Sequence, residues 1–433
     1  MAAGNLISHV RQAVILVGGR GTRLGVYTQR VPKPLLPIDF NTVFLDDLIE
    51  LIARHGFDDI ILLAGHMADQ FVNRYNGTVK RGAQLRVIVE VEPSGTGGAL
   101  RHAKDYLAPL FLFANGDSFF DVNIRLLDLA LANARDGILG VMALHEVQDA
   151  SRYGRVSFEV GYITGFHEKQ SGLDNNMDLI NAGMCLLSRQ IIDFIPNGPC
   201  SIEKEVFPIL ARNGLLAGVR LKGYFIDIGI PETLIEARNM LPDLRVRPAL
   251  FLFRGKWLNH CDINPPNAED FKLTQGVTRL VKAGNDCGAL VFVVTHKSEV
   301  ASDYSIHEDE NFFLQAFLAV DGAHIDAFYD LPLLNNLDSL GSCHLAHSNL
   351  ATRTGLLKQV MLDWLIDRTA SVIIGNQDGD LDFFRDDEIQ CLLFNADRVD
   401  SLILDVMKLL SPRLVKRTQI SYKSRKKKGV LVS

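Results

Sequence analysis

The sequence predicts an α/β protein with two domains, and three observations lead to that prediction. The chain has 433 residues, which is long for one domain and comfortable for two. In its first half, short apolar runs alternate with segments of helical spacing, which indicates a mainly parallel, three-layer sheet. After a proline-containing stretch near residue 240 the same alternation begins again, which indicates a second α/β domain.

Apolar runs rich in Val, Ile, Leu and Phe are typical of buried strands. In the first domain these runs are 13–19, 59–65, 85–92, 110–117 and 137–145. Residues 43–56 and 98–107 have helical spacing. The corresponding runs of the second domain are 249–259, 288–296, 323–330 and 370–376. Ligands of such sheets bind at the carboxyl ends of the strands, so functional residues are expected there.

The domain boundaries follow from these patterns. We expect a first domain over 1–240, a linker over 241–248, a second domain over 249–412 and a basic tail over 413–433. The tail is interpreted as a solvated terminus, and contact with an anionic surface is the alternative.

The composition limits the class of protein. A hydrophobic fraction of 47% and a charged fraction of 22% are ordinary for a soluble globular chain. The net charge of −6 argues against nucleic-acid binding. No apolar run reaches the ~18 residues that span a bilayer, and the N-terminal segment is a poor signal peptide. The cysteines lack C-x-x-C spacing, which predicts reduced thiols in a cytoplasmic protein without a metal cage.

A glycine-rich stretch, GGRGTRL (18–24), follows the first buried run. Glycines at such a turn let backbone N–H groups approach a phosphate closely. Arg23 and Lys33, the latter between two prolines, carry charges that neutralise a polyphosphate. The spacing matches neither the P-loop nor the dinucleotide-binding pattern. Taken alone, this stretch could equally be a structural turn.

Further motifs accompany this loop. GGRGTRL followed by VPKPLLP resembles the signature of sugar-1-phosphate nucleotidylyltransferases. The rest of that family's pattern follows in order: EPSGTGGAL (92–100), NGDSFFD (115–121), RYGRV (152–156), GFHEK (165–169), NAG (181–183), SIEKEVFP (201–208) and GYFIDIGIPE (223–232). The resemblance covers roughly residues 11–238. It implies an α/β, Rossmann-like, mixed-sheet nucleotidyltransferase domain of GT-A-like type.

The resemblance also implies a reaction and its residues. A sugar-1-phosphate oxygen attacks the α-phosphorus of a nucleoside triphosphate, and pyrophosphate leaves. Arg23 would stabilise the pyrophosphate, Lys33 would bridge the reacting phosphates, and Asp117 and Asp227 would bind Mg²⁺. The remaining nucleotide-binding residues implied are Leu16, Gly18, Gly19, Gly21, Thr22, Glu92, Gly95, Gly97 and Gly98. Those implied for the sugar phosphate are Gly154, Glu168, Lys169, Asn181 and Glu203.

Some of these residues have simpler interpretations. Glu92 would contact the base or be a solvated loop residue, and the family has Leu where Ser94 stands. Glu168 and Lys169 alone would be a surface pair. The segment SIEKEVFP could be a helix N-terminus capped by Ser201, and both interpretations of it can hold.

Within the family, the motifs look closest to D-glycero-α-D-manno-heptose 1-phosphate guanylyltransferases, which use GTP. Mannose-1-phosphate guanylyltransferases share most of these motifs, and UTP, CTP and dTTP are alternative nucleotides.

Residues 249–409 resemble haloacid-dehalogenase (HAD) phosphatases of the heptose bisphosphate and histidinol phosphatase group. Where that group has F-L-D-R-D-G-x-L-N, this chain has FLFRGKWLN, so Phe253 replaces the nucleophile and Gly255 the general acid. A phenyl ring cannot attack phosphorus or bind Mg²⁺. The other departures are Lys256, Ala351 and Asn376, with Thr295 and Asp380 retained and Cys343 and His344 as remnants of zinc ligands.

The resemblance therefore predicts a HAD-like fold without phosphatase chemistry. Such a domain could stabilise the transferase, form an interface in a homo-oligomer or bind a regulatory ligand.

The favoured hypothesis is a Mg²⁺-dependent guanylyltransferase acting on heptose 1-phosphate for surface-polysaccharide synthesis. In the route to GDP-heptose a phosphatase acts before guanylyl transfer, so a fused phosphatase relic favours heptose. Transfer to mannose 1-phosphate, a non-catalytic regulatory protein and an active phosphatase are the alternatives. The presence of Arg23, Lys33, Asp117 and Asp227 argues against a retired enzyme.

Overall fold

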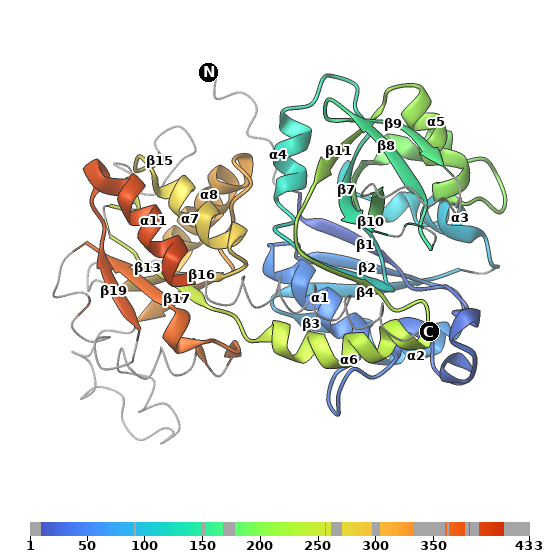
Figure 1. Ribbon diagram of the computed structural model, residues 1–433, viewed down its shortest axis with the longest axis horizontal. Coiled ribbons are helices and arrows are strands. Elements are labelled where there is room, and N and C mark those ends of the chain that lie inside the picture. Colours follow the sequence, from blue (N-terminus) through green and yellow to red (C-terminus); the bar gives the residue numbers. More distant parts are fainter. Residues whose placement is uncertain are drawn as a thin grey trace, which may run out of the picture. The chain divides into compact units, whose positions relative to one another are not determined.

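The structure, a computed structural model, contains two compact units (Figure 1). The N-terminal unit comprises Val10–Pro242, and the C-terminal unit takes in the described residues from Asp243 onward. The residues that the structure describes are 10–90, 92–148, 150, 152–167, 178–255, 257–260, 271–296, 304–331, 360–361, 363–376, 381 and 389–410. The predicted basic tail lies outside them.

A ten-stranded sheet is the centre of the N-terminal unit, with the strand order β3-β4-β2-β1-β5-β10-β7-β11-β9-β8. Its strands are β1 (Gln12–Leu16), β2 (Asp59–Ala64), β3 (Val79–Lys80), β4 (Ala83–Val89), β5 (Leu110–Asn115), β7 (Gly140–Val147), β8 (Arg155–Glu159), β9 (Tyr162–His167), β10 (Asp178–Ser188) and β11 (Leu216–Arg220). The first predicted strands are confirmed, with ends shifted by a few residues. Their apolar runs fit strands that are buried on both faces.

The sheet is mixed, as the family resemblance implies, and the prediction of a mainly parallel sheet is wrong for part of it. Strands β4, β2, β1 and β5 run parallel to one another. Strand β10 then runs antiparallel to both β5 and β7. Antiparallel strands can be joined by short hairpins, as β8 and β9 are. The alternation of strands and helices that predicts a parallel sheet is therefore absent from this part of the sequence.

Two short strands, β6 (Ser118–Asp121) and β12 (Tyr224–Asp227), form a separate antiparallel pair. The α-helices of the unit are α1 (Phe44–Arg54), α2 (Ala68–Tyr75), α3 (Gly95–His102), α4 (Leu126–Ala132), α5 (Phe207–Arg212) and α6 (Pro231–Arg245). Shorter helical turns are η1 (Thr22–Thr28), η2 (Lys33–Leu35), η3 (Lys104–Tyr106), η4 (Arg189–Phe194) and the π-helical η5 (Ile202–Val206).

Helix boundaries differ from the prediction in two places. The segment predicted as one helix over 98–107 is α3 followed by the separate turn η3. Helix α6 continues through Pro242 to Arg245, so the first part of the predicted linker is helical. Proline costs a helix one N–H donor, but apolar packing of Leu241 and Leu244, both almost fully buried, holds this last turn.

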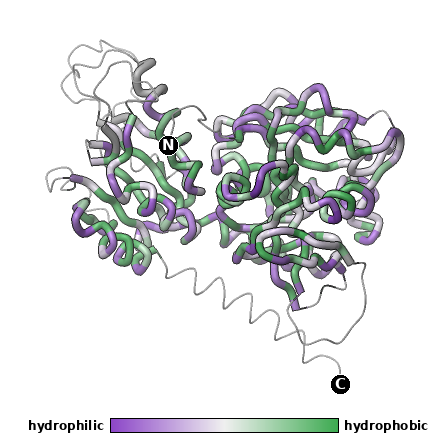
Figure 2. Tube along the Cα trace, turned by 90° about the horizontal axis from the view of Figure 1, so that it is seen from above, coloured by the Kyte–Doolittle hydropathy of each residue, from purple (hydrophilic) through white to green (hydrophobic). Residues whose placement is uncertain are grey.

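The core of the N-terminal unit lies along the central strands, where Figure 2 shows hydrophobic residues inside and hydrophilic residues outside. Val14, Ile61 and Phe111 from three neighbouring strands are completely buried. At the edge of the unit, the buried Arg125 donates from Nε to the His55 carbonyl at 2.7 Å and from Nη1 to the Val10 carbonyl at 2.9 Å. The sheet is thus a rigid base for the loops at its strand ends.

The C-terminal unit is a second α/β body. Its five-stranded sheet is parallel throughout, in the order β17-β16-β13-β18-β19. The strands are β13 (Ala249–Phe253), β16 (Leu290–His296), β17 (Ala327–Leu331), β18 (Val372–Gly375) and β19 (Gln390–Leu393), with a small pair, β14 (Asn259–His260) and β15 (Lys272–Leu273). The helices are α7 (Val277–Asp286), α8 (Tyr304–Val320), α11 (Val399–Leu410) and the turns η7 (Arg368–Ala370) and η9 (Ala396–Arg398).

Both faces of this sheet are covered. Leu250 and Leu252 belong to one apolar cluster, whereas Phe251 and Phe253 belong to another. Since neighbouring residues of a strand point to opposite faces, an uninterrupted apolar run such as ALFLF is what a doubly covered sheet requires.

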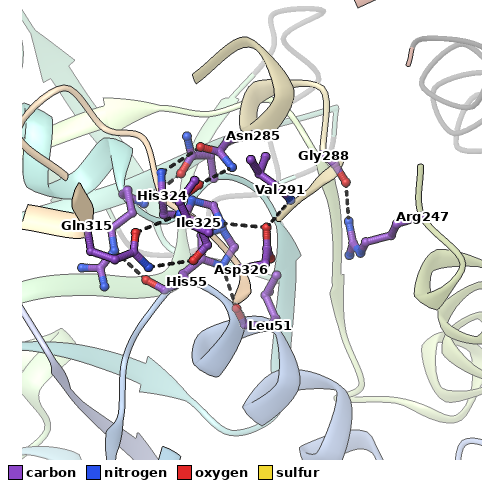
Figure 3. A network of polar contacts seen from close by, with 12 residues as sticks. Leu51, His55, Arg247, Asn285, Gly288, Val291, Gln315, His324, Ile325 and Asp326 are labelled. Carbon is purple, nitrogen blue, oxygen red and sulfur yellow. Dashed lines mark hydrogen bonds and ion pairs between the residues drawn. The ribbon is translucent and has the colours of Figure 1, made fainter. Parts of the chain in front are cut away.

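Buried polar side chains set the start of β17 (Figure 3). Asn285 accepts from the His324 backbone N–H at 2.8 Å and donates to the His324 carbonyl at 3.1 Å. Gln315 makes the same pair of bonds to Ile325, and Asp326 Oδ2 accepts from the Val291 N–H at 2.7 Å. These side chains form hydrogen bonds with backbone N–H and C=O groups next to the region where β16 and β17 pair.

Among the helices of the described residues, none combines the length and the apolar character that a membrane crossing demands.

Candidate active site

A buried lysine lies at the centre of the candidate site. Lys33 begins the short turn η2, and only 6% of the residue is exposed. Its Nζ lies 2.6 Å from Asp117 Oδ2 and 3.8 Å from Asp227 Oδ2. Pro32 and Pro34 restrict the backbone on both sides, so the ammonium group has a defined approach to the two carboxylates.

The pair of strands β6 and β12 brings the two carboxylates together. Asp117 lies between β5 and β6, and Asp227 is the last residue of β12, opposite Ser118 of β6. The Ile228 N–H donates to the Asp117 carbonyl at 3.0 Å, which closes this end of the pair. Two residues that are far apart in the sequence therefore share one strand end.

The electrostatics of Asp227 reflect this arrangement. Burial raises the pKa of Asp227, and the neighbouring Asp117 charge raises it further, whereas Lys33 acts in the opposite direction. Asp227 Oδ1 accepts a hydrogen bond from the Gly229 N–H at 2.8 Å. Lys33 thus offsets part of the electrostatic cost of placing two carboxylates at one strand end.

These carboxylates fit a magnesium ion. Mg²⁺ is usually bound by one or two carboxylates, and phosphate oxygens and water complete its shell. In the described part of the chain no group of three or more His, Cys, Asp or Glu side chains could hold a metal. Asp117 and Asp227 are thus two oxygen ligands of the kind that a magnesium site uses when a bound molecule and water supply the others.

The glycine-rich loop crosses the end of β1 next to this site. A methyl group on Gly18 would lie 3.0 Å from the Gly65 backbone nitrogen, so Gly18 is required by packing. Gly21 has a φ of +61° and its carbonyl accepts from Thr28 Oγ1 at 3.0 Å. Gly19, in contrast, has open space where a side chain would be. Its backbone is thus the part of this loop that a ligand can approach.

The loop EPSGTGGAL continues into α3. Gly95 has a φ of +73°, and a methyl group there would lie 2.5 Å from the Cys200 carbonyl oxygen. The Gly97 N–H donates to the same carbonyl at 2.9 Å, and a methyl group on Gly98 would contact Ser94 Cβ at 2.5 Å. The contacts of these glycines in the structure are therefore with the chain itself.

Glu92 lines a cavity of about 360 Å³ together with Glu90, Ser94, Gly98, Arg101, His102 and Gly198. Glu90 is not among the residues predicted from the sequence. Its Oε2 accepts from Ser94 N at 3.2 Å and from Ser94 Oγ at 2.9 Å, and its Oε1 lies close to Gly18. Glu90 joins the two glycine-containing loops. The sequence feature that could have indicated it is the spacing of two residues between Glu90 and Glu92, just after β4.

The predicted sugar-side residues are partly described. Asn181 Oδ1 accepts from the Gly183 N–H at 2.9 Å, within a β-bulge of β10. Gly183 has a φ of +79°, and a methyl group there would lie 3.1 Å from Ser118 Cβ, beside the carboxylates. Gly154 follows Tyr153 just before β8. Glu168 and Lys169 lie outside the described residues.

Glu203 ties two motifs together. Its Oε2 accepts from Thr96 Oγ1 at 2.6 Å and from Ser201 Oγ at 3.0 Å, so it joins α3 to η5. Ser201 Oγ also accepts from the Lys204 N–H at 3.3 Å, which confirms the predicted N-terminal cap, although the turn that it begins is π-helical.

Two arginines approach the carboxylates. A methyl group on Gly229 would lie 3.3 Å from Arg23 Nη2 and 3.5 Å from Arg152 Nη2. Arg152 Nη2 lies 3.4 Å from Asp227 Oδ1. In the sequence, Arg152 is only one residue of the RYGRV motif, because a basic loop residue has no distinguishing pattern. Of the predicted residues, Arg23, Lys33, Asp117 and Asp227 are therefore brought together.

The chain belongs to the nucleotidyl transferase family, whose model matches residues 12–243. This match spans nearly the whole N-terminal unit, including the glycine-rich loop and both aspartates.

Several known proteins are similar to the chain. Mannose-1-phosphate guanyltransferase beta-B of Xenopus laevis is 34% identical over 239 residues, which are 53% of this chain and 64% of the relative. Mannose-1-phosphate guanyltransferase of Saccharomyces cerevisiae is 34% identical over 233 residues, which are 52% of this chain and 63% of the relative. The chain thus spans less than two thirds of these relatives. A crystal structure of HddC from Yersinia pseudotuberculosis is 31% identical, with a TM-score of 0.46, and the match covers 53% of this chain and 99% of that one.

Two glycines of the predicted nucleotide site should respond differently to alanine. Gly95→Ala should lower the free energy of unfolding by ~2 kcal/mol or more, since its methyl group meets the Cys200 carbonyl at a positive φ. Gly19→Ala meets nothing within 4 Å and should change stability by less than about 0.5 kcal/mol. Urea denaturation of both variants measures the difference, and equal stabilities would contradict it.

Proposed function

We propose that the chain transfers a guanylyl group from GTP to a sugar 1-phosphate and releases pyrophosphate. The observation that carries this proposal is the Lys33 ammonium group held between Asp117 and Asp227, at 2.6 and 3.8 Å. A buried cation beside two cation-binding carboxylates suits a reaction in which negatively charged phosphates must approach one another.

In this reaction an oxygen of the sugar phosphate forms a bond to the α-phosphorus of GTP. The bond from that phosphorus to the pyrophosphate oxygen breaks on the opposite side. Lys33 neutralises the α-phosphate and the incoming phosphate, and Arg23 binds the departing pyrophosphate. Gly18, Gly19, Gly21 and Thr22, after Leu16 at the end of β1, hold the triphosphate. Asp117 and Asp227 would hold Mg²⁺, which when bound supplies further charge neutralisation to the phosphates.

Specificity is assigned to two neighbouring regions. The guanine N1–H and N2–H groups are donors that suit the Glu92 carboxylate, which faces the cavity beside α3. Gly154, Glu168, Lys169 and Asn181 would bind the sugar phosphate. Glu203 already accepts two hydrogen bonds from the chain itself, so its role is to position the first turn of α3, which contains Thr96.

Two sugars are candidates. The sequence motifs favour D-glycero-α-D-manno-heptose 1-phosphate, and so does the resemblance of the second domain to heptose bisphosphate phosphatases. The names of the 34%-identical relatives favour mannose 1-phosphate. A product with GDP on either sugar would serve polysaccharide synthesis.

We also infer that the C-terminal unit is a HAD-like domain without phosphatase activity. Phe253 ends β13, the position of the nucleophile in the resemblance, and is 4% exposed. Trp257 Nε1 donates to the Phe253 carbonyl at 2.9 Å, and its ring stacks on Phe394 at 4.6 Å between centroids. Apolar rings thus fill the strand end. Lys256, Cys343, His344, Ala351 and Asp380 lie outside the described residues.

Pyrophosphate release tests the proposed transfer. Purified protein with Mg²⁺ and GTP should release pyrophosphate with one of the two sugar phosphates, and the ratio of kcat/KM values identifies the sugar. Activity with another nucleotide only would remove guanine from the proposal. No release with any nucleotide would favour a non-catalytic regulatory protein instead.

Lys33→Ala should lower the turnover by about 10²-fold or more, since it removes a charge that stabilises the transition state. Lys80→Ala, at an exposed lysine of β3, is the matched control and should leave turnover unchanged. Thermal unfolding shows whether each variant is folded. A folded Lys33→Ala protein with wild-type turnover would refute the role of Lys33.

Phe253→Asp tests the second unit. Restoring a carboxylate there should cost ~3 kcal/mol or more of unfolding free energy, because the charge is buried among apolar side chains. Phe312→Asp, at a ring that is 54% exposed on α8, should change stability little. Denaturant unfolding and phosphate release are measured on the full chain. Phosphate release from sugar bisphosphates by the wild-type chain would contradict the inference of an inactive domain, and a Phe253→Asp protein as stable as the wild type would contradict the burial argument.

A further inference from the structure

Arg152 lies in the connection between β7 and β8 and reaches the carboxylate pair. Its Nη2 is 3.4 Å from Asp227 Oδ1, and its guanidinium carbon lies 5.5 Å from the centroid of the Tyr153 ring. The side chain is 30% exposed. The aromatic ring supports the guanidinium group while one edge of it stays accessible.

Two cations hold Asp227 from its two sides. Arg152 faces Oδ1, and Lys33 faces Oδ2. Any metal ion that takes Asp227 as a ligand must compete with both of them, because like charges repel at these distances. Of the two, Arg152 is the one that can move without disturbing buried structure, since Lys33 is only 7% exposed.

The donors of Arg152 are not exhausted by this contact. The Nε atom of Arg152 is buried, and no described residue forms a hydrogen bond with it. The Nη2 atoms of Arg152 and Arg23 both approach the position above Gly229, beside Asp227. The Asp227 Oδ1 atom is the anionic group at this point, and planar guanidinium groups also match phosphate oxygens.

We propose that Arg152 neutralises Asp227 when no metal is bound and turns its guanidinium group to the triphosphate when metal and nucleotide bind. This inference rests on the proposed function, because it takes the ligand to be a nucleoside triphosphate with Mg²⁺. Arg152 therefore weakens binding of the metal alone and strengthens binding of the polyphosphate. The two ligands are coupled through one side chain.

Arg155 offers a matched control. It lies three residues further along, at the start of β8, and its side chain is 34% exposed. It forms an ion pair with Asp178 instead of a site carboxylate. Arg155→Gln removes the same charge and a similar ion pair from a position three residues away, but the pair that it removes is with Asp178 and not with Asp227.

The test uses two probes on the full chain, neither of which needs a nucleobase or a sugar. Binding of Mn²⁺ alone is measured by electron paramagnetic resonance of the free ion. Binding of inorganic tripolyphosphate with Mg²⁺ is measured by calorimetry. Arg152→Gln should bind Mn²⁺ about fivefold more tightly, since a competing ion pair is removed, and tripolyphosphate about tenfold more weakly.

Arg152→Lys should keep the wild-type affinity for Mn²⁺ and recover part of the affinity for tripolyphosphate, because it restores the charge without the planar donors. Arg155→Gln should match the wild type with both probes. The inference is overturned if Arg152→Gln changes neither affinity, weakens both, or behaves as Arg155→Gln does. Opposite shifts in a protein that releases no pyrophosphate from GTP would support the role of Arg152 and reject the proposed transfer.

Discussion

Two carboxylates that lie close together in a partly buried site must be compensated by positive charge, and the N-terminal unit is organised around this requirement. Burial raises the cost of ionising Asp227, and the neighbouring Asp117 charge adds to it. Lys33 compensates part of this cost at 2.6 and 3.8 Å, and Arg152 contributes from the other side. In the proposed reaction, a divalent cation would add to this compensation when it binds together with phosphates.

The fold provides the rigidity that holds such charges in place. Strand β6 follows β5 directly and pairs with β12. The backbone positions of Asp117 and Asp227 are therefore set by hydrogen bonding between strands. The bulge at Gly183 lets β10 pass Ser118 without a clash, and Pro32 and Pro34 restrict the turn that carries Lys33. A loose arrangement would allow Lys33 to neutralise one carboxylate and leave the other with an uncompensated charge.

Sequence motifs singled out three residues that lie near one another in the structure. Lys33, Asp117 and Asp227 lie in motifs whose order along the chain is distinctive, and the structure brings these three together. Arg152 could not be predicted, because its importance depends on Asp227, 75 positions away, and nothing in RYGRV indicates that contact. Gly95 was predicted to let a nucleobase approach the backbone. In the structure, the position of a side chain on Gly95 is taken up by the Cys200 carbonyl. Antiparallel strands were missed since hairpins lack the intervening helices that mark parallel ones.

The carboxyl ends of β5 and β13 are occupied by side chains of opposite character, charged in the N-terminal unit and apolar in the C-terminal unit. In the N-terminal unit, the carboxyl end of β5 leads to Asp117, and the unit bears the cost of burying charge near its sheet. In the C-terminal unit, β13 ends in Phe253, and Trp257 and Phe394 stack beside it. Apolar rings at that position need no compensating ion or ligand, so they stabilise the sheet by burial alone. The charged strand end thus carries an electrostatic cost that burial increases, whereas the apolar strand end adds to the core of its unit.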